Sequence, residues 1–205
     1  MPVVKICNED TETAYRYPSD IRNLINYIYK DSKVVSSDPR YPVIYVRAMP
    51  DFFCSDYIKI RETIPEIIIR NHEVFGKTEG KLIHHIVITF TPEEFFILDR
   101  CGCLPEFMNL LIHDYFNMGY IAGYAIHWDT QNHHVHLFVD NISYFDGHRF
   151  YLPNECIIIA EKLDYYCNFY RSLHRGDCLL AAVCFPHILP PAYFAQNIFP
   201  DDDEE

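Results

Sequence analysis

Residues 134–137 read His-Val-His-Leu, an alternation of histidine with aliphatic side chains that opens a mostly apolar run. In a β-strand, side chains two positions apart point to the same face. We therefore expect His134 and His136 together on one face of a strand, with Val135 and Leu137 buried on the other. This segment constrains the fold more than any other, because it requires a sheet that packs through one face and carries polar groups on the opposite face.

A third histidine, His127, lies shortly upstream and completes a candidate ligand set with His134 and His136. Three neutral imidazoles that converge on one point can hold a divalent metal ion and leave positions open for a substrate. Histidine ligands suit Mn, Ni, Zn or Co, and availability in the cell favours Mn or Mg. The alternative is a surface pair of histidines, in a chain that contains 11 of them.

The residues around these histidines resemble the third motif of conjugative relaxases, the single-stranded DNA nickases that mobilise plasmids and integrative elements. The similarity is to the MobP-type relaxase, or mobilisation nuclease, domain of the HUH endonuclease superfamily. Besides its histidines, that motif contains an acidic residue, an amide or further histidine, and a later Asn and Asp-Gly. The matching residues are, in order, His127, Asp129, Asn132, His134, His136, Asn141 and Asp146-Gly147.

Two upstream segments match the other family motifs in the right order. The segment from His84 to Glu94 contains Thr-Phe-Thr-Pro-Glu-Glu and is similar to the second motif, a strand that ends in Ser-Phe-Ser-Pro and acidic residues. The segment from Ile25 to Lys33 is similar to the first motif, which carries the nucleophilic tyrosine ahead of a short turn and a lysine. The resemblance covers residues 1–175, expected to form one domain, and leaves a tail at 176–205 whose acidic end we expect to be disordered.

The resemblance implies an α+β fold with a central antiparallel sheet and helices, in the ferredoxin-like, circularly permuted layout of the HUH relaxase palm. The histidine strand would lie at the centre of the sheet, and the tyrosine helix would pack nearby. The sequence pattern agrees, because strands and helices alternate and the last strands are typical of hairpins, which fits helices over one face of a sheet. We expect strands at residues 3–7, 42–47, 82–90, 120–128 and 133–141. We expect two helices to start at the N-caps Ser19 and Thr91, and three more to cover residues 55–75, 105–118 and 153–173.

The activity implied by the resemblance is cleavage of single-stranded DNA at a transfer origin by a metal-dependent tyrosine transesterase. The tyrosine would become joined to the 5′-phosphate and release a free 3′-hydroxyl. Spacing to Lys33 favours Tyr27 as the nucleophile, with Tyr29 as the alternative. A helical wheel places both beside the apolar stripe and so cannot choose between them, and Tyr15 and Tyr17 are more distant alternatives. A phenol is protonated at neutral pH, so it needs a nearby metal ion or base to attack.

Further residues take roles from the same resemblance. Asp129 and His85 occupy motif positions from which they could orient a metal-bound imidazole, although Asp129 is equally explained as a turn residue. Lys33 and Asn141 are the expected DNA contacts. Single-stranded DNA is therefore the expected partner, with accessory relaxosome proteins as further partners.

Composition narrows the class of protein. No apolar run approaches the roughly 20 residues of a membrane span, and the N-terminus lacks a signal-peptide layout. We therefore expect a cytoplasmic protein with reduced cysteines. The formal net charge of −12 is unusual for a protein that binds the phosphates of a nucleic acid. It leaves three alternatives: a local basic strip on an acidic body, weak binding, or a domain that no longer binds DNA.

Other functions share part of the pattern. A non-catalytic relaxase-like DNA-binding or regulatory protein would explain the acidity, but the intact histidines and Tyr27 oppose it. A histidine-triad nucleotide hydrolase needs a histidine where this chain has Asn132. A rolling-circle replication initiator shares the chemistry but not the order of the motifs. A covalent DNA adduct would separate the enzyme from the non-catalytic binder.

Overall fold

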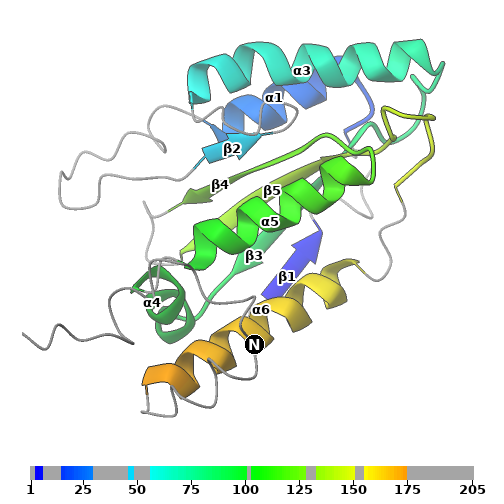
Figure 1. Ribbon diagram of the computed structural model, residues 1–205. Helices are drawn as coiled ribbons and strands as arrows, with labels where there is room; N and C mark the ends of the chain where they lie inside the picture. The colour runs from blue at the N-terminus through cyan, green and yellow to red at the C-terminus, as the bar shows by residue number, and fades with distance from the viewer. Residues whose placement is uncertain are drawn as a thin grey trace, which may run out of the picture.

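A computed structural model describes residues 3–6, 15–29, 46–48, 56–100, 103–127, 133–150 and 155–174. Within these ranges, strands and helices are interspersed along the chain, with two helices in succession followed by two strands in succession (Figure 1). In chain order the elements are β1 (Val3–Ile6), α1 (Pro18–Ile28), β2 (Val46–Ala48), α3 (Tyr57–Val74), β3 (Ile83–Thr89), α4 (Pro92–Arg100), α5 (Cys103–Asn117), β4 (Ala122–His127), β5 (His134–Asp140) and α6 (Glu155–His174).

The strands join one antiparallel sheet in the order β1-β3-β5-β4-β2. β5 occupies the central position, so the strand that carries His134 and His136 is hydrogen-bonded on both sides. The register pairs His134 with Thr89 of β3 and with His127 of β4. The predicted α+β class, the antiparallel sheet and the central place of the histidine strand are confirmed, and the arrangement is consistent with the HUH relaxase fold.

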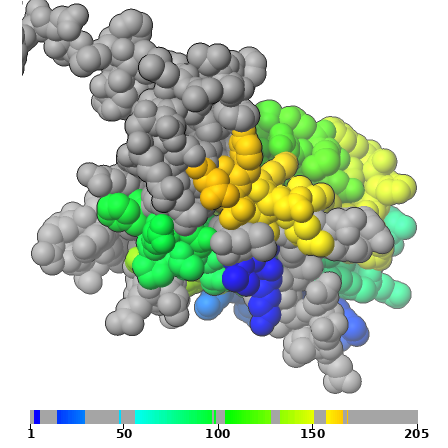
Figure 2. Space-filling model, turned by 90° about the horizontal axis from the view of Figure 1, so that it is seen from below, coloured from blue at the N-terminus to red at the C-terminus, as the bar shows by residue number. Residues whose placement is uncertain are grey.

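The face opposite the histidines carries one apolar core. Val135, Leu137 and Val139 point into it, as the alternation predicted. Helices α4, α5 and α6 cover this face, and Figure 2 shows α6 beside β1 at the edge of the sheet. The helices contribute Phe95, Leu98, Leu104, Phe107, Met108, Leu111, Ile112, Tyr115, Ile159 and Leu163 to the core.

The histidine face is also covered at one end, by α1 and α3, so the prediction of helices over only one face was wrong. Along β5 the side chains on this face change from His134 and His136 to Phe138, which packs with Ala125 of β4 and Ala48 of β2. The apolar sides of both helices pack against this end of the sheet. They consist of Ile21, Leu24, Ile25 and Ile28 on α1, and of Ile60, Ile64, Ile68 and Ile69 on α3. The packing brings the C-terminus of α1 to the histidine end of the sheet.

Side chains at the helix starts explain where α4 and α1 begin. α4 begins as predicted: the Thr91 backbone N–H donates to Glu94 Oε2 (2.9 Å), and the Glu94 N–H donates to Thr91 Oγ1 (3.2 Å). The predicted cap at Ser19 was wrong, because α1 already begins at Pro18, a residue suited to the first turn. The Asp20 carboxylate then accepts two backbone N–H groups from ahead of the helix, each at 2.9 Å.

Most other boundaries lie close to their predicted positions, although α5 begins at Cys103 rather than Pro105. The predicted turn at 145–148 is confirmed, because the Ser143 N–H donates to the His148 carbonyl at 2.8 Å. Residues 42–45 of the second predicted strand and the predicted tail at 176–205 lie outside the described ranges. Among the described helices, none combines the length and the apolar character needed to cross a membrane.

A buried ion pair ties the end of β5 to α3. His72 Nδ1 lies 2.8 Å from the Lys77 carbonyl oxygen. His72 Nε2 lies 2.9 Å from the Leu82 carbonyl oxygen and 2.8 Å from Asp140 Oδ1. With Asp140 ionised, all three partners accept, so both ring nitrogens carry hydrogen and His72 is an imidazolium. Burial raises the pKa of Asp140, against the hydrogen bonds from His72 and Asn71 that favour its charged form. Asp140 also accepts a hydrogen bond from Asn71 Nδ2 at 2.9 Å, as its charged form favours.

The hydrogen bonds of His72 also decide the direction in which its pKa moves. Burial alone would lower the pKa of His72, but the hydrogen bonds to Asp140 and to the two carbonyls outweigh burial. The pKa of His72 is therefore raised above its ordinary value of 6.5. This direction agrees with the charged ring that the geometry requires.

Candidate metal centre

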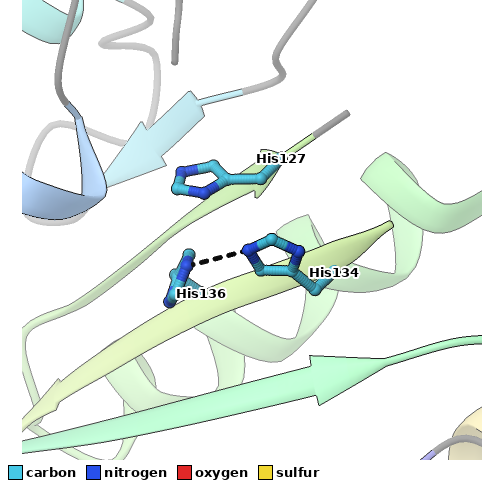
Figure 3. Close-up of side chains that lie close together, drawn as sticks. All are labelled: His127, His134 and His136. Carbon is cyan, nitrogen blue, oxygen red and sulfur yellow. Dashed lines mark hydrogen bonds between the residues drawn. The ribbon is translucent and has the colours of Figure 1, made fainter. Parts of the chain in front are cut away.

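Three imidazoles meet at one end of the sheet. His127 ends β4 and lies opposite His134 at the start of β5, and Ala125 lies opposite His136. Paired residues of antiparallel strands share a face, so the three rings project from the same side. One nitrogen of each ring lies within 4.8 Å of the others, and Figure 3 shows the rings converging. They are not a surface pair, because His127 is 0% and His136 only 4% exposed.

The nitrogen atoms of the set fit a shared metal ion. His134 Nε2 and His136 Nε2 lie 3.1 Å apart. Two nitrogens bound to one ion at about 2.0–2.1 Å are separated by roughly 3.0–3.4 Å in common geometries. His127 Nε2 lies 2.8 Å from the Ile28 carbonyl oxygen, so it must donate there. In a neutral ring this leaves the lone pair on His127 Nδ1. Each ring can therefore offer one nitrogen lone pair.

His85 lies on the far side of His136 from the other ligands. Its Nε2 lies 2.8 Å from His136 Nδ1, and the two rings stack with centroids 5.0 Å apart. Its Nδ1 lies 3.0 Å from the Tyr15 hydroxyl. Burial, and to a smaller extent the nearby His127, lowers the pKa of His85 to about 4. His85 is therefore neutral at neutral pH and can orient His136 through a hydrogen bond, as the second motif implied.

The two candidate nucleophiles occupy different surroundings. Tyr27 is 46% exposed, and its ring lies edge-on to His136 with centroids 5.4 Å apart. Tyr29 is fully buried, and its hydroxyl donates to the Tyr124 carbonyl oxygen at 3.2 Å. Tyr29 is the C-cap of α1, and its backbone N–H donates to the Ile25 carbonyl oxygen at 3.0 Å, so it lies on the buried side of the helix with Ile25. The structure places the exposed Tyr27 ring against an imidazole of the set and engages the buried Tyr29 hydroxyl with the Tyr124 carbonyl oxygen.

Asn141 lies away from the triad, beyond the opposite end of β5. It is buried, its Nδ2 donates to the Lys81 carbonyl oxygen at 2.5 Å, and its Oδ1 accepts from His84 Nε2 at 2.6 Å. Burial lowers the pKa of His84 to about 4, so this ring is neutral and donates through Nε2. Both ends of the amide are engaged inside the protein, so its position does not support the predicted DNA contact.

Two predicted site residues, Lys33 and Asp129, lie outside the described ranges. Tyr15, offered by the sequence only as a distant alternative nucleophile, contacts the site through His85 instead. Its place in the chain carries no motif, and it is one of 16 tyrosines. No local pattern indicates its contact with His85.

The second and third motifs thus lie on neighbouring strands of one site. A family model described as relaxase, MobA/VirD2-like, nuclease domain matches residues 55–170. The chain belongs to the MobA/VirD2-like relaxases. The relaxase match includes all three candidate metal ligands and His85, and it starts after the segment that carries Tyr27. No curated protein and no solved structure matches the chain.

Proposed function

We propose that this relaxase domain cleaves single-stranded DNA at a transfer origin, with Tyr27 as the nucleophile and a divalent metal ion held by His127, His134 and His136. The observation that carries the proposal is the position of Tyr27, an exposed tyrosine whose ring lies 5.4 Å from that of His136. A phenol at the surface beside converging imidazoles supplies a nucleophile and a phosphate-binding centre in one place.

Cleavage requires the Tyr27 oxygen to attack phosphorus while the bond from phosphorus to the 3′-oxygen breaks. The phenol gives up its proton, the 3′-oxygen takes one up, and the 5′-phosphate stays joined to Tyr27. A divalent ion, when bound, supplies Lewis acidity at the non-bridging phosphate oxygens. Three imidazole ligands would leave coordination positions open to the phosphate, which separates such a site from a closed structural one.

The helix that carries Tyr27 is tied to the ligand set through the next residue. The Ile28 carbonyl oxygen accepts the hydrogen bond from His127 Nε2 at 2.8 Å, and the Ile28 side chain is fully buried. The hydrogen bond that orients the ligand His127 therefore also fixes the backbone next to the nucleophile. Holding two reacting groups in a fixed relation removes much of the entropic barrier to a reaction.

The finer parts of the proposal rest on the resemblance of the motifs. They are mobilisation of a plasmid or integrative element, partnership with accessory relaxosome proteins, and action in the cytoplasm. Mn²⁺ or Mg²⁺ is the expected ion, with Zn²⁺, Ni²⁺ or Co²⁺ as alternatives that imidazole ligands suit. The role of Lys33 as a DNA contact and that of Asp129 as an orienting carboxylate remain predictions.

The proposal is tested with labelled single-stranded oligonucleotides from DNA that flanks the gene, incubated with the protein and Mn²⁺. We expect a covalent adduct that survives SDS, that disappears in Tyr27→Phe and that persists in Tyr17→Phe. Tyr17 is a matched control, because it lies at the other end of α1 and is 68% exposed. DNA binding without any adduct would overturn the proposal in favour of a non-catalytic relaxase-like DNA-binding protein.

A further inference from the structure

We propose that Tyr15 is a positioning residue of the metal centre: through His85, it selects the hydrogen-bonding state in which His136 can bind a metal ion. The inference rests on the proposed function, since it assumes that His136 is a ligand. It adds a residue that belongs to none of the three relaxase motifs.

The three groups form an unbroken polar chain. The Tyr15 hydroxyl lies 3.0 Å from His85 Nδ1, and His85 Nε2 lies 2.8 Å from His136 Nδ1. Their positions in the sequence are far apart, 70 residues for the first contact and 51 for the second. His85 and His136 are 5% and 4% exposed, so water has little access to the hydrogen bond between them.

The location of the hydrogens follows from the rule that a neutral imidazole carries one N–H. To bind a metal ion through Nε2, His136 must keep its hydrogen on Nδ1 and donate it to His85 Nε2. His85 then carries its own hydrogen on Nδ1 and donates it to the Tyr15 oxygen. If Tyr15 instead donated to His85, both rings would reverse and His136 Nε2 would carry a hydrogen. The hydroxyl of Tyr15 must therefore accept.

The backbone of Tyr15 has a conformation that residues other than glycine rarely adopt. Its φ is +31°, and it is the residue other than glycine with positive φ in the described part of the chain. The Leu82 N–H donates to its carbonyl oxygen at 2.9 Å, which anchors it beside the start of β3. Strained residues persist where the surroundings hold them firmly, and they concentrate at functional sites. This anchoring fixes the hydroxyl against His85.

The test compares Tyr15→Phe with wild type and with Tyr17→Phe. Phenylalanine keeps the packing of the Tyr15 ring against the apolar cluster under α1 and α3 and removes only the hydroxyl. We expect Zn²⁺ affinity, measured by calorimetry, to fall about 10-fold or more in Tyr15→Phe. The unfolding temperature of the metal-free protein should change little, and Tyr17→Phe should match wild type. Wild-type Zn²⁺ affinity in a folded Tyr15→Phe would overturn the inference.

A second measurement needs no variant. In wild-type protein labelled with ¹⁵N-histidine and loaded with Zn²⁺, NMR should place the hydrogen on Nδ1 of both His85 and His136. A hydrogen on Nε2 of His85 would overturn the inference. These measurements separate the two proposals. If Tyr15→Phe forms the covalent adduct and keeps wild-type Zn²⁺ affinity, only the role of Tyr15 is contradicted. Absence of Zn²⁺ binding to wild type would instead contradict the metal site itself.

Discussion

The substitution Asp140→Asn should strongly destabilise the domain and change its response to pH. Asp140 is 0% and His72 2% exposed, and the two are joined at 2.8 Å. Asparagine has nearly the same shape but cannot neutralise the buried imidazolium. If its Oδ1 accepts from His72, its Nδ2 replaces the oxygen that accepts from Asn71 Nδ2. Removing one member of a buried pair costs about 3–5 kcal/mol. For a chain of this size, that cost lowers the unfolding temperature by roughly 6–20 °C.

The pH dependence of this cost has a definite sign. The pKa of folded His72 is raised above 6.5 by Asp140 and two carbonyls, against the lowering effect of burial. The contribution of His72 is therefore fully present below pH 6.5 and is lost as the pH rises through the folded pKa. The pair also loses its charge in acid, where Asp140, whose pKa is raised by burial, becomes protonated. We expect the difference in unfolding free energy between wild type and Asp140→Asn to be largest near pH 6.5 and to shrink towards pH 9.

Urea unfolding followed by circular dichroism at several pH values measures this difference. Glu66→Gln is the matched control. Glu66 lies on α3, the helix that carries His72, and pairs with Arg22 at 2.7 Å. The side chains of Glu66 and Arg22 are 56% and 47% exposed. Removal of this pair should change stability little, since solvent screens exposed pairs. A cost for Asp140→Asn below about 1 kcal/mol, or one that does not vary with pH, would refute the assignment of a buried charged pair.

Three further outcomes are expected. Removing divalent metal with EDTA should lower the unfolding temperature of wild type but not of His136→Ala, because an ion at 100 times its Kd stabilises the folded state by about 2.7 kcal/mol. Equal changes in the unfolding temperature of the two proteins, measured by scanning fluorimetry, would argue against the metal site. Tyr29→Phe should cost about 0.5–1.5 kcal/mol in chemical unfolding through the lost hydrogen bond to Tyr124, while adduct yield per folded protein stays unchanged; loss of the adduct would make Tyr29 the nucleophile. Asn141→Ala should cost about 1–3 kcal/mol because it leaves buried polar groups unsatisfied; its affinity for single-stranded DNA, measured by fluorescence anisotropy, should match wild type, and a large loss in the folded variant would restore the predicted DNA contact.

The parts of the fold that follow from local rules were predictable from the sequence. The alternation at His134 and His136 placed both rings on one face and their neighbours in the core, because the period of a strand is two residues. The pairing of Thr91 with Glu94 located the start of α4 for a similarly local reason. Relaxase motifs then added the expectation that a tyrosine helix lies near the histidine strand, as it does.

The contacts that complete the site are not local. His127 is oriented by the Ile28 carbonyl across 99 residues, and Tyr15 reaches His85 across 70. Such pairs depend on how α1 packs, and its apolar stripe does not reveal which face of the sheet it will cover. The large side chain of Phe138, on the same face as the ligands, receives α1 and α3 there. Expecting helices on one face alone failed for this reason. The helical wheel could not choose between Tyr27 and Tyr29, because it does not show what lies beside each edge of the apolar stripe.

Attack by Tyr27 beside the histidine set can be tested most directly by locating the modified residue in the covalent DNA adduct. Trypsin cleaves after Arg22 and Lys30, so one peptide carries both Tyr27 and Tyr29, and fragmentation in the mass spectrometer distinguishes them. After nuclease digestion of the DNA, the proposed mechanism predicts a nucleotide phosphate on Tyr27 alone, formed with Mn²⁺ and absent with EDTA. A nucleotide on Tyr29 or on another tyrosine, or the same yield with EDTA, would contradict it.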